Sequence, residues 1–111
     1  MSEWIEVGLL NDIPKLGARV VKRAEGDIAV FRTADDNVFA LRDKCPHKGG
    51  QLSQGIVHGN RVACPLHDWK IGLDDGQAVA PDKGCAASFP VKIEGEKIVL
   101  SLTANEGCPN T

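Results

Sequence analysis

Two short stretches of this sequence each combine a cysteine with a histidine. The stretch "CPHKGG" contains Cys45 and His47, and the stretch "CPLH" contains Cys64 and His67. Thiolates and imidazoles are common ligands of zinc and iron in proteins. Because each stretch supplies one ligand of each kind, the four residues together predict a metal centre with two cysteine and two histidine ligands.

Two kinds of centre fit these four ligands. Zinc accepts two cysteines and two histidines in a tetrahedron, but finger-type sites usually pair like with like, and Cys-x-His is a tight bite for one ion. In a [2Fe–2S] cluster, one iron can be bound by two cysteines and the other by two histidines, so each loop gives one ligand to each iron. The mixed pairs therefore favour the cluster, and a structural zinc module remains the alternative.

The spacing of the two stretches resembles the signature of Rieske iron–sulfur domains. That signature is Cys-x-His, about sixteen residues, then Cys-x-x-His, and sixteen residues separate His47 from Cys64 here. The resemblance implies a Rieske-type [2Fe–2S] cofactor. It also implies that Cys45 and Cys64 bind the buried iron, and that His47 and His67 bind the outer iron.

Four positions near the motif distinguish this chain from respiratory Rieske proteins. Gly50 and Leu66 stand where those proteins carry a disulfide, and Trp69 and Ile71 stand where they place a serine and a tyrosine. Hydrogen bonds to the cluster sulfurs stabilise the reduced, more negative state. With fewer such donors, we expect a reduction potential toward the low end of the Rieske range.

A longer resemblance narrows the family further. The stretches "DIPKLGARVV", "GDIAVFRTADDNVFAL", "CPHKGGQLSQGIVHG", "CPLHDWKIGLDDGQA" and "PDKGCAASFPVKIEGEKIVL" are similar to the small subunits of NAD(P)H-dependent assimilatory nitrite reductases, over most of residues 12–100. This implies a large-subunit partner that holds flavin, siroheme and a [4Fe–4S] cluster and reduces nitrite to ammonia. The chain itself would transfer electrons without a substrate site of its own. The alternative is a Rieske ferredoxin that serves an aromatic-ring dioxygenase.

The composition sets limits on the partners and the compartment. The chain has 111 residues and a formal net charge of −2, so no strong positive field favours nucleic acid or an anionic membrane. Its apolar runs are far shorter than the ~20 residues of a spanning helix. The start "MSEWIEVGLL" lacks the pattern of a signal peptide. We therefore expect a cytoplasmic protein that binds neither nucleic acid nor membrane.

The elements that must position the four ligands read as short strands separated by turns. We expect one all-β domain over residues 1–111, a small sandwich or barrel of short strands with a frayed tail at 104–111. The resemblance implies a Rieske-type antiparallel β-sandwich with a cluster-binding subdomain of two loops at about 43–85. Single helical turns are expected near 9–13 and 52–54. The expected strands are 3–8, 18–24, 27–33, 37–43, 56–58 and 61–63, followed by a hairpin over 88–103 that turns at 94–96.

Three further cysteine and histidine residues lie outside the two motifs. Cys85 and Cys108 have no histidine two or three residues on, unlike the ligand pairs. We expect a packed thiol at Cys85 and an exposed thiol at Cys108 in the tail. His58 precedes Gly59-Asn60, a pair that favours a tight turn, and is expected to be exposed at the tip of a hairpin.

Overall fold

The architecture was obtained as a computed structural model of the whole chain. The structure describes residues 4–24, 26–44, 51–64, 70–73, 76–78 and 85–102. All its regular elements in these ranges are β-strands, apart from two single turns of 3₁₀ helix. Within the described ranges, no helix is long and apolar enough to cross a membrane.

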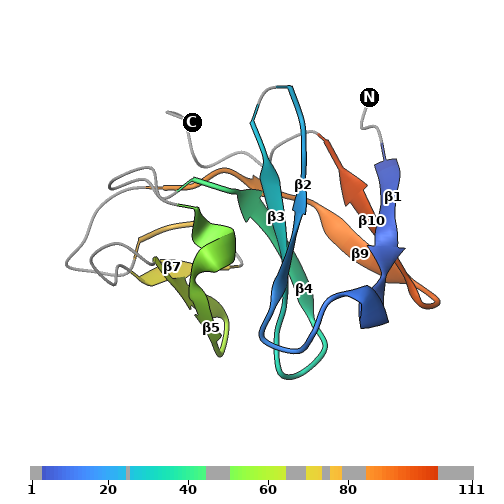
Figure 1. Cartoon of the computed structure of the whole chain (residues 1–111), viewed down its shortest axis with the longest axis horizontal. Coiled ribbons are helices and arrows are strands. Elements are labelled where there is room, and N and C mark those ends of the chain that lie inside the picture. The colour runs from blue at the N-terminus through green and yellow to red at the C-terminus, as the bar shows by residue number, and fades with distance from the viewer. Residues whose placement is uncertain are drawn as a thin grey trace.

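The centre of the molecule is a four-stranded antiparallel sheet. It contains β2 (Ala18–Val21), β3 (Ile28–Arg32), β4 (Val38–Arg42) and β8 (Ser88–Phe89), in the order β2-β3-β4-β8. The strands are rich in valine, isoleucine and phenylalanine, which suit a pleated and buried surface. Figure 1 shows this sheet between the other two sheets of the molecule.

A second sheet joins the two ends of the described chain. It consists of β1 (Trp4–Leu9), β10 (Lys97–Ser101) and β9 (Val91–Glu94), with β10 in the middle. A bulge shifts the register of β1 between Glu6 and Gly8, just before a 3₁₀ turn, η1 (Leu10–Asp12). The sheet forms one side of the molecule (Figure 1).

The third sheet lies on the opposite side and contains shorter strands. It consists of β5 (Ile56–His58), β6 (Arg61–Ala63) and β7 (Lys70–Gly72), in that order. A 3₁₀ turn, η2 (Leu52–Gln54), precedes β5. The segment from Cys64 to Lys70, which contains His67, is therefore the connection between two paired strands of this sheet.

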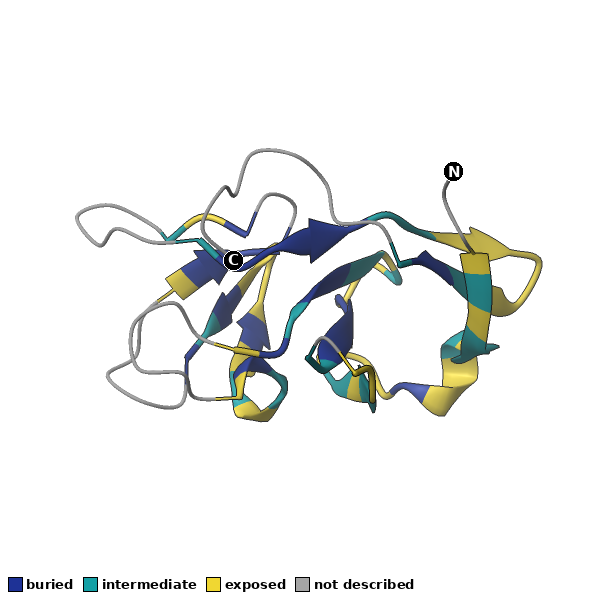
Figure 2. Cartoon of the chain, turned by 90° about the horizontal axis from the view of Figure 1, so that it is seen from above, coloured by how far each residue is buried: buried dark blue, intermediate teal, exposed yellow. Residues whose placement is uncertain are grey.

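The central sheet is covered on both faces. Every residue of β3 is buried, which is unusual for a strand that meets water on one side. Ala29 and Phe31 pack with the third sheet, whereas Ile28 and Val30 pack with the second. Figure 2 shows the buried residues concentrated in the strands between the outer sheets. Two hydrophobic clusters therefore share one sheet.

The all-β prediction and most of the predicted strands are confirmed, with one correction in the last hairpin. The hairpin β9–β10 turns at Gly95 and Glu96 as expected. However, Ser88 and Phe89 pair with β4 of the central sheet and do not continue into β9. Pro90 lacks the N–H that a sheet ladder needs, so it marks the point where the chain changes sheets.

Candidate metal centre

Cys64 is the predicted ligand that the structure describes. It directly follows β6, is 2 % exposed and belongs to the hydrophobic cluster that contains Leu52, Val62 and Ile71. The other three predicted ligands, Cys45, His47 and His67, lie outside the described residues. The buried position suits the prediction that this thiol faces the inner iron.

The segment with His67 is anchored by a regular β-ladder. Ala63 directly precedes Cys64, and Lys70 directly follows the segment 65–69. These two residues pair with each other in the ladder between β6 and β7. Ile71 of this ladder is fully buried and pairs with Val62. This ladder fixes both ends of the segment 65–69 through backbone hydrogen bonds.

The segment with Cys45 and His47 is anchored by side-chain hydrogen bonds. Asp43 follows β4, and its Oδ1 and Oδ2 atoms accept hydrogen bonds from the backbone N–H of Ser53 at 2.7 Å and from its Oγ at 2.8 Å. These two residues stand on either side of the segment 45–50. Neither residue was predicted from the sequence to support the site, because neither residue type reveals whether its side chain is buried and hydrogen-bonded or solvated.

A third connection, between Gln77 and Cys85, has its ends paired next to the hydrophobic cluster that contains Cys64. Gln77 forms a β-bridge with Cys85, and the N–H of Ala86 donates to the carbonyl of Gly76 at 2.8 Å. Gly76 has φ of +72°, and a Cβ there would collide with the Ala86 carbonyl. Cys85 is disulfide-bonded, so the expected packed thiol at this position is wrong.

The residues present fit an iron–sulfur centre. Within the described ranges, no group of three metal-ligating side chains occurs, so a centre that uses Cys64 would need ligands from outside those ranges, where the predicted Cys45, His47 and His67 lie. A buried thiolate among apolar side chains is stable only if a cation or hydrogen bonds compensate its charge. A cluster iron beside Cys64 would provide that compensation.

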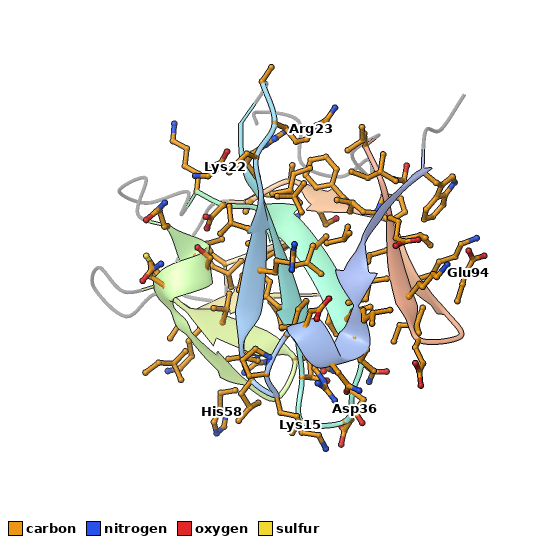
Figure 3. All side chains as sticks on the ribbon, turned by 45° about the vertical axis from the view of Figure 1, so that its right-hand side comes forward. Lys15, Lys22, Arg23, Asp36, His58 and Glu94 are labelled. Atoms are coloured by element: carbon orange, nitrogen blue, oxygen red, sulfur yellow. The ribbon has the colours of Figure 1, made fainter. Side chains whose placement is uncertain are left out.

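His58 and Lys22 are two further titratable residues of the described chain. His58 pairs with Arg61 across the β5–β6 turn and is exposed, as predicted. Figure 3 places it at the end of the molecule opposite Lys22. Lys22 donates to Asp27 at 2.9 Å, and this hydrogen bond raises the pKa of the Lys22 ammonium above its ordinary value.

Comparison with known families decides what kind of centre this is. A family model for the Rieske [2Fe-2S] domain matches residues 3–90. The chain belongs to the Rieske [2Fe-2S] domain family. The Rieske domain binds a [2Fe-2S] cluster, so the predicted cofactor and the Rieske-type fold are confirmed, and the chain is an electron-transfer component.

Similar proteins come from several oxidoreductase systems, among them dioxygenases and nitrite reductases. The ferredoxin component of a naphthalene 1,2-dioxygenase system from Pseudomonas aeruginosa is 30% identical over 106 residues, which cover 92% of this chain and 98% of the relative. A Mycobacterium tuberculosis structure, provisionally described as an NADH-dependent nitrite reductase small subunit, superposes with a TM-score of 0.84 at 20% identity, over 95% and 99% of the two chains. A chain from a complex of oxygenase and ferredoxin in carbazole 1,9a-dioxygenase gives 0.84 at 23% identity, over 94% and 97%.

Proposed function

We propose that this chain is the Rieske small subunit of a cytoplasmic NAD(P)H nitrite reductase, and that it relays single electrons during the reduction of nitrite to ammonia. The observation that carries the proposal is the resemblance over most of residues 12–100, which extends well beyond the four ligands. Within that stretch Ile13 is fully buried, and its carbonyl oxygen accepts a hydrogen bond from Arg32. The resembling stretch is therefore part of the hydrophobic core.

The proposed ligands are Cys45 and Cys64 for the buried iron and His47 and His67 for the outer iron. Support comes from the mixed ligand pairs and from the buried thiol of Cys64. When bound, the cluster supplies reversible one-electron transfer. The protein's own contribution is to hold Cys64 away from water and to close the ends of the ligand segments.

A second candidate function is that of a ferredoxin for an aromatic-ring dioxygenase. It is favoured by the 30% identity to a dioxygenase ferredoxin component, which extends over nearly the full length of both chains. Both candidates share the fold and the cofactor, so the partner distinguishes them. In the first the partner is a large subunit with flavin, siroheme and a [4Fe–4S] cluster, and in the second it is an oxygenase.

Co-purification tests the two candidates directly. The tagged chain is expressed together with the siroheme protein encoded in the same genome, and NAD(P)H-dependent nitrite consumption is measured with and without the chain. We expect a stable complex whose activity depends on the chain. A chain that does not associate with the siroheme protein, but passes electrons to an aromatic-ring oxygenase, would establish the second candidate instead.

The reduction potential provides a further check on the proposed site. Ile71 offers no hydroxyl to a cluster sulfur, and fewer hydrogen bonds leave the reduced state less stabilised. We expect a potential toward the low end of the Rieske range, which begins at about −150 mV. A redox titration followed by electron paramagnetic resonance measures it, and a value near the upper end would contradict the expectation.

A further inference from the structure

Asp43 is a buried acidic residue that forms hydrogen bonds through both its side chain and its backbone. It is 8 % exposed, and both carboxylate oxygens accept hydrogen bonds from Ser53. Its own N–H donates to the carbonyl of Asp27 at 2.8 Å, next to the start of β3. A buried carboxylate is unfavourable unless hydrogen bonds compensate it, and bonds to a charged acceptor are stronger than neutral ones.

The hydrogen bonds between Asp43 and Ser53 join the two ends of the first ligand segment, residues 45–50. Asp43 stands two residues before Cys45, and Ser53 stands three residues after Gly50. Between them the chain passes from β4 of the central sheet to η2, and among the described residues no strand pairing joins the two ends. In contrast, the second ligand segment is closed by the backbone pair Ala63 and Lys70.

Ser53 also links Asp43 to the core beside the other ligand. Its neighbour Leu52 is fully buried and lies in the same hydrophobic cluster as Cys64. The contact from Asp43 therefore fixes the first segment to the element that packs beside the second.

We propose that Asp43 is a positioning residue, which holds the first ligand segment in register with the second through Ser53. This inference rests on the proposed ligand role of Cys45. Cluster ligands are sensitive to the groups that orient them, and loss of such a group typically weakens metal binding by about 10- to 100-fold. Asp43 acts on the geometry of the segment and does not itself bind iron.

The test compares three variants of the loaded protein. Asp43→Ala removes both hydrogen bonds, Ser53→Ala removes only the bond to Oγ, and Asp43→Asn keeps the shape and an acceptor while it removes the charge. We measure the rate of iron loss to a chelator and the electron paramagnetic resonance spectrum of the reduced cluster. Iron loss from Asp43→Ala should be about 10- to 100-fold faster, with shifted or broadened g values. Ser53→Ala should fall between it and the wild type, and Asp43→Asn should restore most of the wild-type behaviour.

Asp36→Ala is the matched control. Asp36 also accepts two hydrogen bonds, both from Arg32, but it lies in the β3–β4 turn at the opposite end of these strands from Asp43. Its loss should leave the spectrum and the rate of iron loss unchanged. If Asp43→Ala gives the wild-type spectrum and the same iron loss as Asp36→Ala, the positioning role is wrong. If Cys45→Ser keeps its cluster, the ligand assignment beneath the inference is wrong as well.

Discussion

The two faces of the central sheet carry different kinds of structure. Toward the second sheet, β4 contributes Ala40 to a cluster closed by Ile98 and Leu100 of the five-residue strand β10. Toward the third sheet, β4 contributes Leu41 to the cluster that contains Cys64. The strands on that face have only three residues each.

The difference shows how the chain supports the segments that carry the predicted ligands. Long paired strands satisfy backbone hydrogen bonds on the scaffold face. On the site face the strands are short, and specific contacts fix the ends of the connecting segments. These contacts are the ladder pair Ala63 and Lys70, the bridge between Gln77 and Cys85, and the hydrogen bonds to the Asp43 carboxylate. Changes on the two faces should therefore have separable effects on stability and on the cluster.

The largest difference between the effect on the cluster and the effect on stability is expected at Cys64. Cys64→Ser should abolish cluster binding, because a hydroxyl is a much poorer iron ligand than a thiolate at neutral pH. Iron analysis and visible absorption measure the loss, and circular dichroism reports whether the strands persist. Val62→Ala is the control, because Val62 is fully buried in the same cluster two residues earlier but supplies no ligand. Full iron content in Cys64→Ser would refute the role of this thiol.

A pair of leucines compares the two faces with the same chemical change. Leu52 and Leu100 are both fully buried, the first in the site-face cluster and the second in the scaffold-face cluster. Each substitution by alanine should lower the free energy of unfolding by about 2–5 kcal/mol through lost contacts and a cavity. Only Leu52→Ala should also speed iron loss to a chelator. Equal iron loss from both variants would mean that the faces are not separable.

The sequence predicted these elements unevenly, for physical reasons. The β5–β6 hairpin was predicted to the residue, because Gly59 adopts φ of +61° in a turn that only a few residue types favour. The change of sheet at Pro90 was missed, because the apolar residues on either side of it read as one strand. Pairing of β1 with β10 depends on contacts between distant segments, which local patterns do not encode.

The candidate site was predicted from ligand spacing, and its supports were not. Cys64 is buried as the proposed inner-iron ligand should be, while the roles of Cys45, His47 and His67 stay predictions. Asp43 and Ser53 are ten residues apart, and nothing in either residue type distinguishes a buried hydrogen-bonded acid from a solvated one. The contact between Asp43 and Ser53 forms only because folding brings these two residues together.

Two glycines on the site face test how tightly its connections are closed. Gly76 and Gly59 both have positive φ, but a Cβ on Gly76 would meet the Ala86 carbonyl, whereas a Cβ on Gly59 would meet nothing within 4 Å. Gly59→Ala should cost about 1–2 kcal/mol of stability through backbone strain. Gly76→Ala adds overpacking of about 1–3 kcal/mol. Urea unfolding measures both, and equal losses would contradict the close approach at Gly76.

The smallest effect is expected at Asp36, far from the ligand segments. Hydrogen bonds from Arg32 lower the pKa of the Asp36 carboxyl below its ordinary value of 3.8. A depressed folded-state pKa contributes stability above the ordinary value, and this contribution is lost as the pH falls through the lower, folded-state value. The side chain is 44% exposed, so solvent screens the pair and the contribution is small.

Asp36→Asn should therefore destabilise the protein slightly at neutral pH and not at a pH below the folded-state pKa. The comparison requires urea unfolding of the variant and the wild type across the acid range, with Asp35→Asn as a control for the same charge change at an exposed neighbour. Arg32 keeps its bonds to the carbonyl oxygens of Leu10 and Ile13 in the variant, which limits the loss to the carboxylate itself. A difference that grew as the pH fell would have the wrong sign for a depressed pKa. Unchanged iron loss in Asp36→Asn would show that this end of the sheet stabilises the fold independently of the metal centre.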